Sequence, residues 1–143
     1  QERRFFFIGS RDEHEYVQRH LDSKPDLQKH VTNCAGVLSI GELAALFEQS
    51  SLLLTNDSGP MHIAASLGTP VVALFGPESP QFYGPRTNAR MIYKALNCSP
   101  CLNMYNAKLF HCPYNARCMS EISTAEVMHA IDEVLVPLQS GVS

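Results

Sequence analysis

The stretch LTNDSGPMHIAA, residues 54–65, decides the fold of this chain. It begins as an apolar strand, passes into polar and glycine residues, and opens at once into a helix of small residues. Asp57 or Ser58 can cap that helix, and Gly59 lets a ligand approach the backbone closely. Pro60 suits the first helical position, where an amide N–H would be unpaired anyway. This order is typical of a phosphate site at a helix N-terminus.

Strand and helix patterns alternate on both sides of this stretch. Apolar runs of strand length occur at residues 5–8, 31–35, 52–54, 71–75 and 90–95, and helical patterns occur at 11–21, from 40, at 60–67 and from 123. The alternation predicts an α/β fold, a Rossmann-like doubly wound parallel sheet. Ligands of such sheets bind outside the carboxyl ends of the strands. The continuous run 5–8 is expected to be a buried strand.

Capping residues and helix-breaking residues mark the expected helix ends. Ser39 with Glu42, and Ser123 with Glu126, form S-x-x-E capping boxes that predict helix starts. Gly68 is expected to end the helix that follows the candidate phosphate-binding turn. Residues 77–87 are rich in Pro, Gly and Ser, which favours a loop or a broken helix.

Composition excludes several classes of function. The chain has 143 residues, a length that fits one domain, and its net charge of −3 provides no basic field for a nucleic acid. Its apolar runs are far shorter than the roughly 20 residues of a membrane-spanning helix. The chain starts with Gln1 rather than Met, and we interpret this start as a cut within a longer protein.

The motif residues also have plain structural explanations. Asp57 can be only a helix cap, and His62 can be a half-buried ring with satisfied hydrogen bonds. Glu13, just beyond the first strand, can accept hydrogen bonds from both ribose hydroxyls, as acidic residues do in Rossmann-type sites. It can equally be an exposed glutamate at a helix start. Leu38 lies in a loop that can be an ordinary connector.

The motif as a whole resembles the glycosyltransferase family 9 enzymes, the lipopolysaccharide heptosyltransferases and their relatives. The similarity runs without a break from residue 54 to residue 77, and it extends back to FIGS at 7–10 and LSIGEL at 38–43. It continues forward to Cys98 and Cys101, so that it covers most of residues 5–136. The resemblance implies a GT-B glycosyltransferase, in which two Rossmann-like domains face each other across a cleft.

The resemblance assigns residues 1–143 to a single, partial C-terminal domain that binds a nucleotide-diphosphate sugar such as ADP-heptose. Transfer would be to a lipopolysaccharide or other glycan acceptor, with no cofactor required. The N-terminal acceptor domain is absent, and with it the catalytic base, so no catalytic residue is assigned in this chain. A preceding strand with a phosphate-binding Lys also has no counterpart. We expect a cytoplasmic protein, with peripheral association at the inner membrane possible for the whole enzyme.

The same resemblance distributes the donor-binding roles. Asp57, Ser58, Gly59 and His62 would contact the diphosphate and the sugar. Glu13 would bind the ribose, and Leu38 would form part of the wall beside the adenine.

Four cysteines gather in a loop insertion at 98–120, namely Cys98, Cys101, Cys112 and Cys118. The C-x-x-C pair resembles the start of a structural zinc site, in which His111 could replace one thiol. Small buried thiols or disulfides are the alternatives. Cys34 is interpreted as a core residue of the second strand.

Two other functions remain open from the sequence. One is a non-catalytic nucleotide-binding module, which would bind nucleotide without preference for a sugar. The other is an interaction domain whose cysteine loop is held by zinc, which would bind metal in a fixed ratio to the chain and bind no nucleotide.

Overall fold

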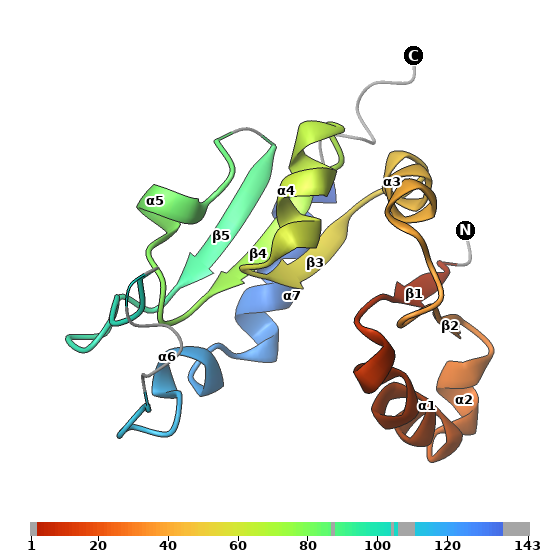
Figure 1. Cartoon of the computed structure of the whole chain (residues 1–143), viewed down its shortest axis with the longest axis horizontal. Coiled ribbons are helices and arrows are strands. Elements are labelled where there is room, and N and C mark those ends of the chain that lie inside the picture. Colours follow the sequence, from red (N-terminus) through yellow and green to blue (C-terminus); the bar gives the residue numbers. More distant parts are fainter. Residues whose placement is uncertain (1–2, 87, 104, 106–110, 136–143) are drawn as a thin grey trace. The chain divides into compact units, whose positions relative to one another are not determined.

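The computed structural model describes residues 3–86, 88–103, 105 and 111–135 (Figure 1). The chain divides into two compact units, a first unit of residues 1–43 and a second unit of residues 44–143. Each unit is an α/β assembly with parallel strands, which confirms the predicted fold class. The expectation that residues 1–143 form one domain stays a prediction.

The first unit is a small parallel βαβ arrangement. Strand β1 (Phe5–Phe7) pairs in parallel with strand β2 (Val31–Asn33), so that Phe5 lies opposite Val31. The crossover contains three short helices, η1 (Arg11–Glu13), α1 (His14–Asp22) and α2 (Pro25–Gln28). The sequence predicted a single helix over residues 11–21, with residues 22–25 ending it. Pro25 instead begins α2, because proline suits the first helical position.

The prediction of a buried strand at residues 5–8 is wrong in the described unit. Phe5, Phe6 and Phe7 are 55%, 43% and 46% exposed. The reason is that β1 has one strand neighbour, and helices α1 and α2 both contact β2. The aromatic side chains of β1 are therefore left at the surface of this unit.

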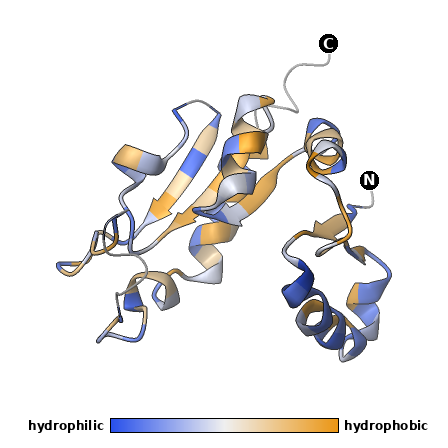
Figure 2. Ribbon diagram, in the orientation of Figure 1, coloured by the Kyte–Doolittle hydropathy of each residue, from blue (hydrophilic) through white to orange (hydrophobic). Residues whose placement is uncertain are grey.

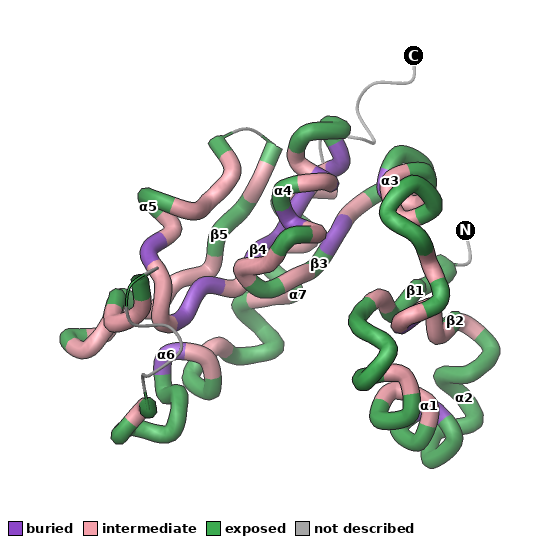
Figure 3. Tube along the Cα trace, viewed as in Figure 1, coloured by how far each residue is buried: buried purple, intermediate pink, exposed green. Residues whose placement is uncertain are grey.

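The second unit contains a three-stranded parallel sheet in the order β3-β4-β5. Its strands are β3 (Leu53–Asn56), β4 (Val71–Phe75) and β5 (Ala89–Tyr93). The central strand β4 is buried on both faces, and Figure 3 shows its buried residues. Figure 2 shows the matching band of hydrophobic residues along β3 and β4. A continuous apolar run is what a doubly covered parallel strand requires.

Helices cover both faces of this sheet. Helix α4 (Gly59–Ser66) contacts β3 and β4, while helix α7 (Thr124–Leu135) contacts β4 and β5. Figure 1 shows α4 in front of the sheet and α7 behind it. Helix α3 (Ile40–Glu48) precedes β3, and α5 (Pro80–Tyr83) and α6 (Arg117–Ser120) are single turns. Single turns have little periodicity, and α6 was not predicted.

The predicted helix ends are confirmed. Ser39 and Glu42 form both bonds of a capping box, with Ser39 N donating to Glu42 Oε2 at 2.8 Å and Glu42 N donating to Ser39 Oγ at 3.3 Å. Ser123 and Glu126 repeat this geometry before α7. Gly68 has a φ of +80°, the left-handed conformation that ends a helix.

A buried hydrogen bond joins α3 to the sheet. Thr69, just before β4, is 4% exposed, and its Oγ1 donates to the Phe47 carbonyl at 2.8 Å. Phe47 itself is a buried core residue. Among the described helices, none has the length and apolar character needed to cross a membrane.

Candidate functional site

The turn from β3 into α4 has the features of an anion-binding site. Ser58 is the N-cap residue, in an extended conformation, but its side chain makes no cap hydrogen bond. The hydroxyl instead turns back toward the strand, donating to the Asn56 carbonyl at 3.3 Å and lying 3.2 Å from Thr55 Oγ1. The first helical residue is Gly59, which is exposed. Ser58 therefore leaves the first-turn amides without a side-chain acceptor.

Asp57 stands beside this helix N-terminus with one carboxylate oxygen buried. Among the buried side-chain nitrogen and oxygen atoms of the described residues, Asp57 Oδ2 is the one that lacks a hydrogen-bond partner. A buried acceptor without a partner costs about 1–3 kcal/mol. The expectation that Asp57 is only a helix cap is wrong, because the cap position belongs to Ser58. A polar group kept at such a cost is a candidate ligand contact.

Glu78 is the second acidic residue at this edge of the sheet. Its pKa is raised to about 7, first because its protonated carboxyl hydrogen bonds the Asp57 carboxyl, then because of burial and the charge of Asp57. Two ionised carboxylates cannot hydrogen bond each other, so the contact is satisfied only while one of them holds a proton. When Glu78 is ionised it cannot donate to Asp57, and the Asp57 carboxylate is then open to a ligand hydroxyl.

His62 lies one helical turn into α4 and is exposed. The alternative that His62 is a half-buried ring with satisfied hydrogen bonds is therefore wrong. The core positions of α4 are Met61 and Ala64, which are completely buried. Residue 62 lies about 100° from residue 61 and about 160° from residue 64 around the helix axis, on the side of α4 away from these core positions. Its ring is accessible to a ligand bound near the helix N-terminus.

Glu13 belongs to the first unit, where it forms a capping box with Ser10. The backbone N–H of Ser10 donates to Glu13 Oε2 at 2.7 Å, and the Ser10 hydroxyl donates to the same atom at 2.9 Å. These hydrogen bonds, the backbone one first, hold the pKa of Glu13 below its ordinary value. The structural role of a glutamate at a helix start is thus confirmed. Both bonds end on Oε2, which leaves the lone pairs of Oε1 for a ligand.

Leu38 is half-buried in the loop after β2. This loop is shaped by Gly36, whose φ is +69° and whose N–H donates to the Gly9 carbonyl at 2.8 Å. A Cβ at Gly36 would lie 2.8 Å from the backbone nitrogen of Arg11 and closer still to its Cα. The loop therefore lies directly against the start of η1. Leu38 and Glu13 follow two paired strands at their carboxyl ends.

The predicted site residues fall into two groups. Asp57, Ser58, Gly59 and His62 lie at the β3–α4 turn of the second unit, whereas Glu13 and Leu38 lie in the first unit. Sequence reasoning missed Glu78, because residues 77–87 were interpreted as a loop or a broken helix with no functional residue. The signal was available: β4 neighbours β3 in the parallel sheet, so the residues that follow both strands meet at one edge.

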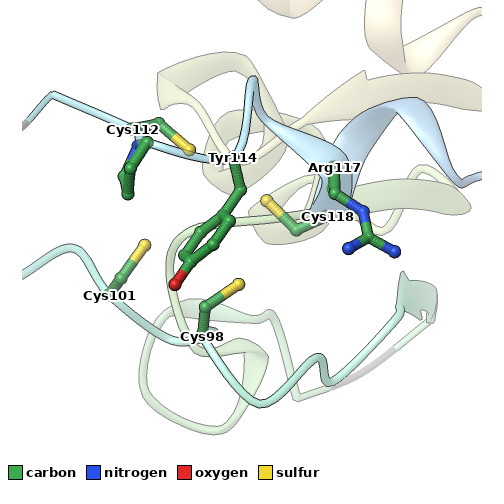
Figure 4. Close-up of a pocket in the computed structure, with 7 residues that line it drawn as sticks. Cys98, Cys101, Cys112, Tyr114, Arg117 and Cys118 are labelled. Atoms are coloured by element: carbon green, nitrogen blue, oxygen red, sulfur yellow. The ribbon is translucent and has the colours of Figure 1, made fainter.

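The cysteine segment forms a separate cavity of about 190 Å³. It is lined by all four clustered cysteines, by Pro113 and Tyr114, and by Arg117 of α6 (Figure 4). Burial, followed by the charge of the neighbouring thiolates, raises the pKa of Cys101 and of Cys118. As the side chains stand, the described residues include no group of three His, Cys, Asp or Glu arranged to hold a metal ion.

All five cysteines are thiols in the described part of the chain. Cys34, which follows β2 in the first unit, is half-buried rather than fully buried. His111 does not line the cavity.

Known proteins resemble this chain over most of its length. The family model described as glycosyltransferase family 9 (heptosyltransferase) matches residues 2–109. Lipopolysaccharide heptosyltransferase 2 of Escherichia coli K12 is 38% identical over 87 residues, which is 59% of this chain and 25% of that protein. Lipopolysaccharide heptosyltransferase 3 of Escherichia coli is 31% identical over 79% of this chain and 32% of that protein. The chain thus spans a quarter to a third of these two relatives.

Two solved structures have the same fold. The ADP-heptose lps heptosyltransferase II of E. coli matches 96% of this chain and 38% of its own, with a TM-score of 0.74 and 27% identity. A glycosyl transferase family 9 protein of Veillonella parvula matches 94% of this chain and 37% of its own, with a TM-score of 0.69 and 30% identity. The family match and the shared fold agree, and this chain belongs to glycosyltransferase family 9, the heptosyltransferase family.

Proposed function

We propose that this chain is the donor-binding part of a heptosyltransferase-type enzyme, which binds a nucleotide-diphosphate sugar for transfer to a glycan. Membership of family 9 supports a glycosyltransferase activity and a nucleotide-sugar donor. The name of the E. coli structure, which specifies ADP-heptose, supports ADP-heptose as the donor. The proposal covers the whole protein, of which this chain would supply the donor side.

The single observation that carries the proposal is the unpartnered Oδ2 of Asp57 beside the uncapped start of α4. A helix N-terminus attracts anions, so the amides of Ser58 and Gly59 would bind the diphosphate. A carboxylate repels phosphate but accepts hydrogen bonds from hydroxyls. Asp57 would therefore bind a sugar hydroxyl, and the exposed His62 would donate to a phosphate oxygen.

The nucleoside is assigned to the first unit. Glu13 would accept a hydrogen bond from a ribose hydroxyl through Oε1, because Oε2 is engaged by Ser10. Leu38 would lie against the base. These two roles come from the family resemblance and from the position of both residues beyond the carboxyl ends of paired strands.

Transfer of the sugar requires a base for the acceptor hydroxyl and stabilisation of the departing diphosphate. This chain would provide the second of these through the α4 amides, and the base would come from an N-terminal acceptor domain. No cofactor is assigned. The relatives' names support a lipopolysaccharide acceptor. We propose a cytoplasmic enzyme that works at the cytoplasmic face of the inner membrane.

Calorimetric titration of the intact protein with ADP, UDP and GDP sugars, and with the bare nucleotides, tests this proposal. Asp57→Asn keeps the size of the side chain but replaces one acceptor oxygen by a donor. Since hydrogen bonds to charged groups contribute about 1.5–3 kcal/mol, we expect it to weaken donor binding about 10- to 100-fold. Asp132→Asn, on the exposed face of α7, is the matched control.

Each outcome discriminates between the candidate functions. Selective binding of one nucleotide sugar, lost in Asp57→Asn and retained in Asp132→Asn, would support the proposal. Equal affinity for the sugar and the bare nucleotide would instead favour a non-catalytic nucleotide-binding module. Unchanged affinity in Asp57→Asn would remove Asp57 from the donor site.

A further inference from the structure

The four clustered cysteines converge from two separate segments of the chain. Cys98 and Cys101 lie on the segment that follows β5, whereas Cys112 precedes α6 and Cys118 lies within it. All four line one cavity, and Figure 4 shows their sulfur atoms directed toward the space around the Tyr114 ring. The cavity lies in the second unit, outside the turn proposed to bind the donor.

Hydrophobic packing does not account for this arrangement. Cys118 is 6% exposed and is the one buried residue among the described residues between 98 and 120. Cys98, Cys101 and Cys112 are half-buried, and Pro113 and Tyr114 are exposed. A segment with so little core is commonly held by a disulfide or a metal ion. The described cysteines form no disulfide, and four thiols around one cavity are the ligands that a structural zinc site uses.

Local hydrogen bonding and charge also favour a cation in the cavity. The backbone N–H of Ala116 donates to Cys112 Sγ at 3.3 Å, a contact that stabilises a sulfur with negative charge. The positive side chain that lines the cavity, Arg117, is paired with Glu121 through two hydrogen bonds. Arg117 therefore does not compensate negative charge on the cavity sulfur atoms, whereas a divalent cation would.

We propose that Cys98, Cys101, Cys112 and Cys118 bind one structural Zn²⁺ ion. Four thiolates suit tetrahedral zinc, with Zn–S distances of about 2.3 Å. The described thiols are not arranged to hold a metal ion as they stand, so the cysteines must change rotamer on binding it. An iron–sulfur cluster uses the same ligands, but the proposed glycosyl transfer has no redox step that would need one.

The ion would stabilise the segment that carries Glu78. The backbone N–H groups of Cys101 and Leu102 both donate to the Pro77 carbonyl, at 2.8 and 2.9 Å. Ser99 Oγ donates to the carbonyl of Gly76. Residues 76 and 77, which directly precede Glu78, are therefore hydrogen bonded to residues 99–102. This consequence rests on the proposed function, whereas metal binding does not.

The test is the metal content of the full-length protein, purified under reducing conditions with zinc supplied and measured by elemental mass spectrometry. We expect about one zinc per chain in the unsubstituted protein. Cys98→Ser and Cys112→Ser each remove a half-buried ligand without disturbing the buried Cys118. Cys34→Ser in the first unit is the matched control. Cobalt in place of zinc gives an independent reading, since thiolate coordination produces charge-transfer absorption bands.

Zinc near one per chain, retained in Cys34→Ser and largely lost in both cavity variants, would support the proposal. So would thiolate-to-cobalt bands that weaken in the same two variants. Absence of metal after reconstitution, equal zinc in all four proteins, iron in place of zinc, or disulfides among the four cysteines would each overturn it. None of these readings requires donor binding, so failure of the metal site and failure of the proposed function are distinguishable.

Discussion

Replacement of Gly36 by alanine is the most direct test of how the loop after β2 is built. The residue has a φ of +69°, and its N–H donates to the Gly9 carbonyl at 2.8 Å. The added Cβ would lie 2.8 Å from the backbone nitrogen of Arg11 and closer still to its Cα. Backbone atoms cannot rotate away as a flexible side chain can. The loop and η1 must therefore separate.

Two effects contribute to the expected destabilisation. A left-handed conformation costs a non-glycine residue about 1–2 kcal/mol. Steric overpacking typically adds about 1–3 kcal/mol. Together they predict a loss of about 2–5 kcal/mol from the free energy of unfolding of the first unit. Such a loss is a large fraction of the 5–15 kcal/mol that stabilises a typical domain.

Two other glycines separate these effects. Gly68 has a φ of +80° but nothing within 4 Å of an added Cβ, so Gly68→Ala should show the conformational cost of about 1–2 kcal/mol alone. Gly41 lies in α3 with open space around it and no positive φ. Gly41→Ala should stabilise the protein, by up to about 1 kcal/mol.

Urea unfolding followed by circular dichroism gives the free energies, and hydrogen exchange of peptides covering β1 and β2 reports on the first unit. The reasoning is refuted if Gly36→Ala costs no more than Gly68→Ala, because the contact with Arg11 would then contribute nothing. It is also refuted if protection in β1 and β2 is unchanged.

Three further substitutions test individual contacts. Because the pKa of Glu78 is raised to about 7, the stability of the unsubstituted protein should fall as the pH rises from about 4.5 through about 7. Glu78→Gln should remove this fall, which thermal melts across the same pH range would show. Glu126→Gln should instead change the stability at acid pH. The hydrogen bond from Lys94, followed by those from Ser123 at the helix cap, lowers the pKa of Glu126 to about 2. The wild-type stability lost between about pH 4.5 and about pH 2 should be absent from the variant, and equal acid sensitivity would contradict the assignment. Thr69→Val should cost about 1–3 kcal/mol in urea unfolding, because it leaves the Phe47 carbonyl without its buried donor, and a neutral result would mean that this bond adds no net stability.

The fold was predictable where the sequence pattern is local. The apolar run of β4 and the capping boxes at Ser39 and Ser123 depend on residues a few positions apart, and the structure confirms them. The exposure of Phe5–Phe7 was not predictable, because an aromatic run has the same sequence whether or not a second layer covers it. Helix α6 has only four residues and therefore no periodicity to detect.

The candidate site was predictable in part for the same reason. Asp57, Ser58, Gly59 and His62 form one continuous motif, so their position at a strand-to-helix turn could be inferred from order alone. Glu78 is 21 residues away in the chain, and its proximity to Asp57 follows from the pairing of β3 with β4. The orientation of the Ser58 hydroxyl, away from the helix, depends on its contact with Thr55 and has no sequence pattern.

The capping box at Glu13 has a consequence for ligand affinity. A free glutamate side chain samples many rotamers, and a ligand that binds it must offset the entropy lost on ordering it. The two bonds from Ser10 to Oε2 order this side chain before any ligand arrives. Glu13 would then meet a ribose as a preorganised acceptor, and Ser10→Ala would weaken nucleotide binding without removing any atom that touches the nucleotide.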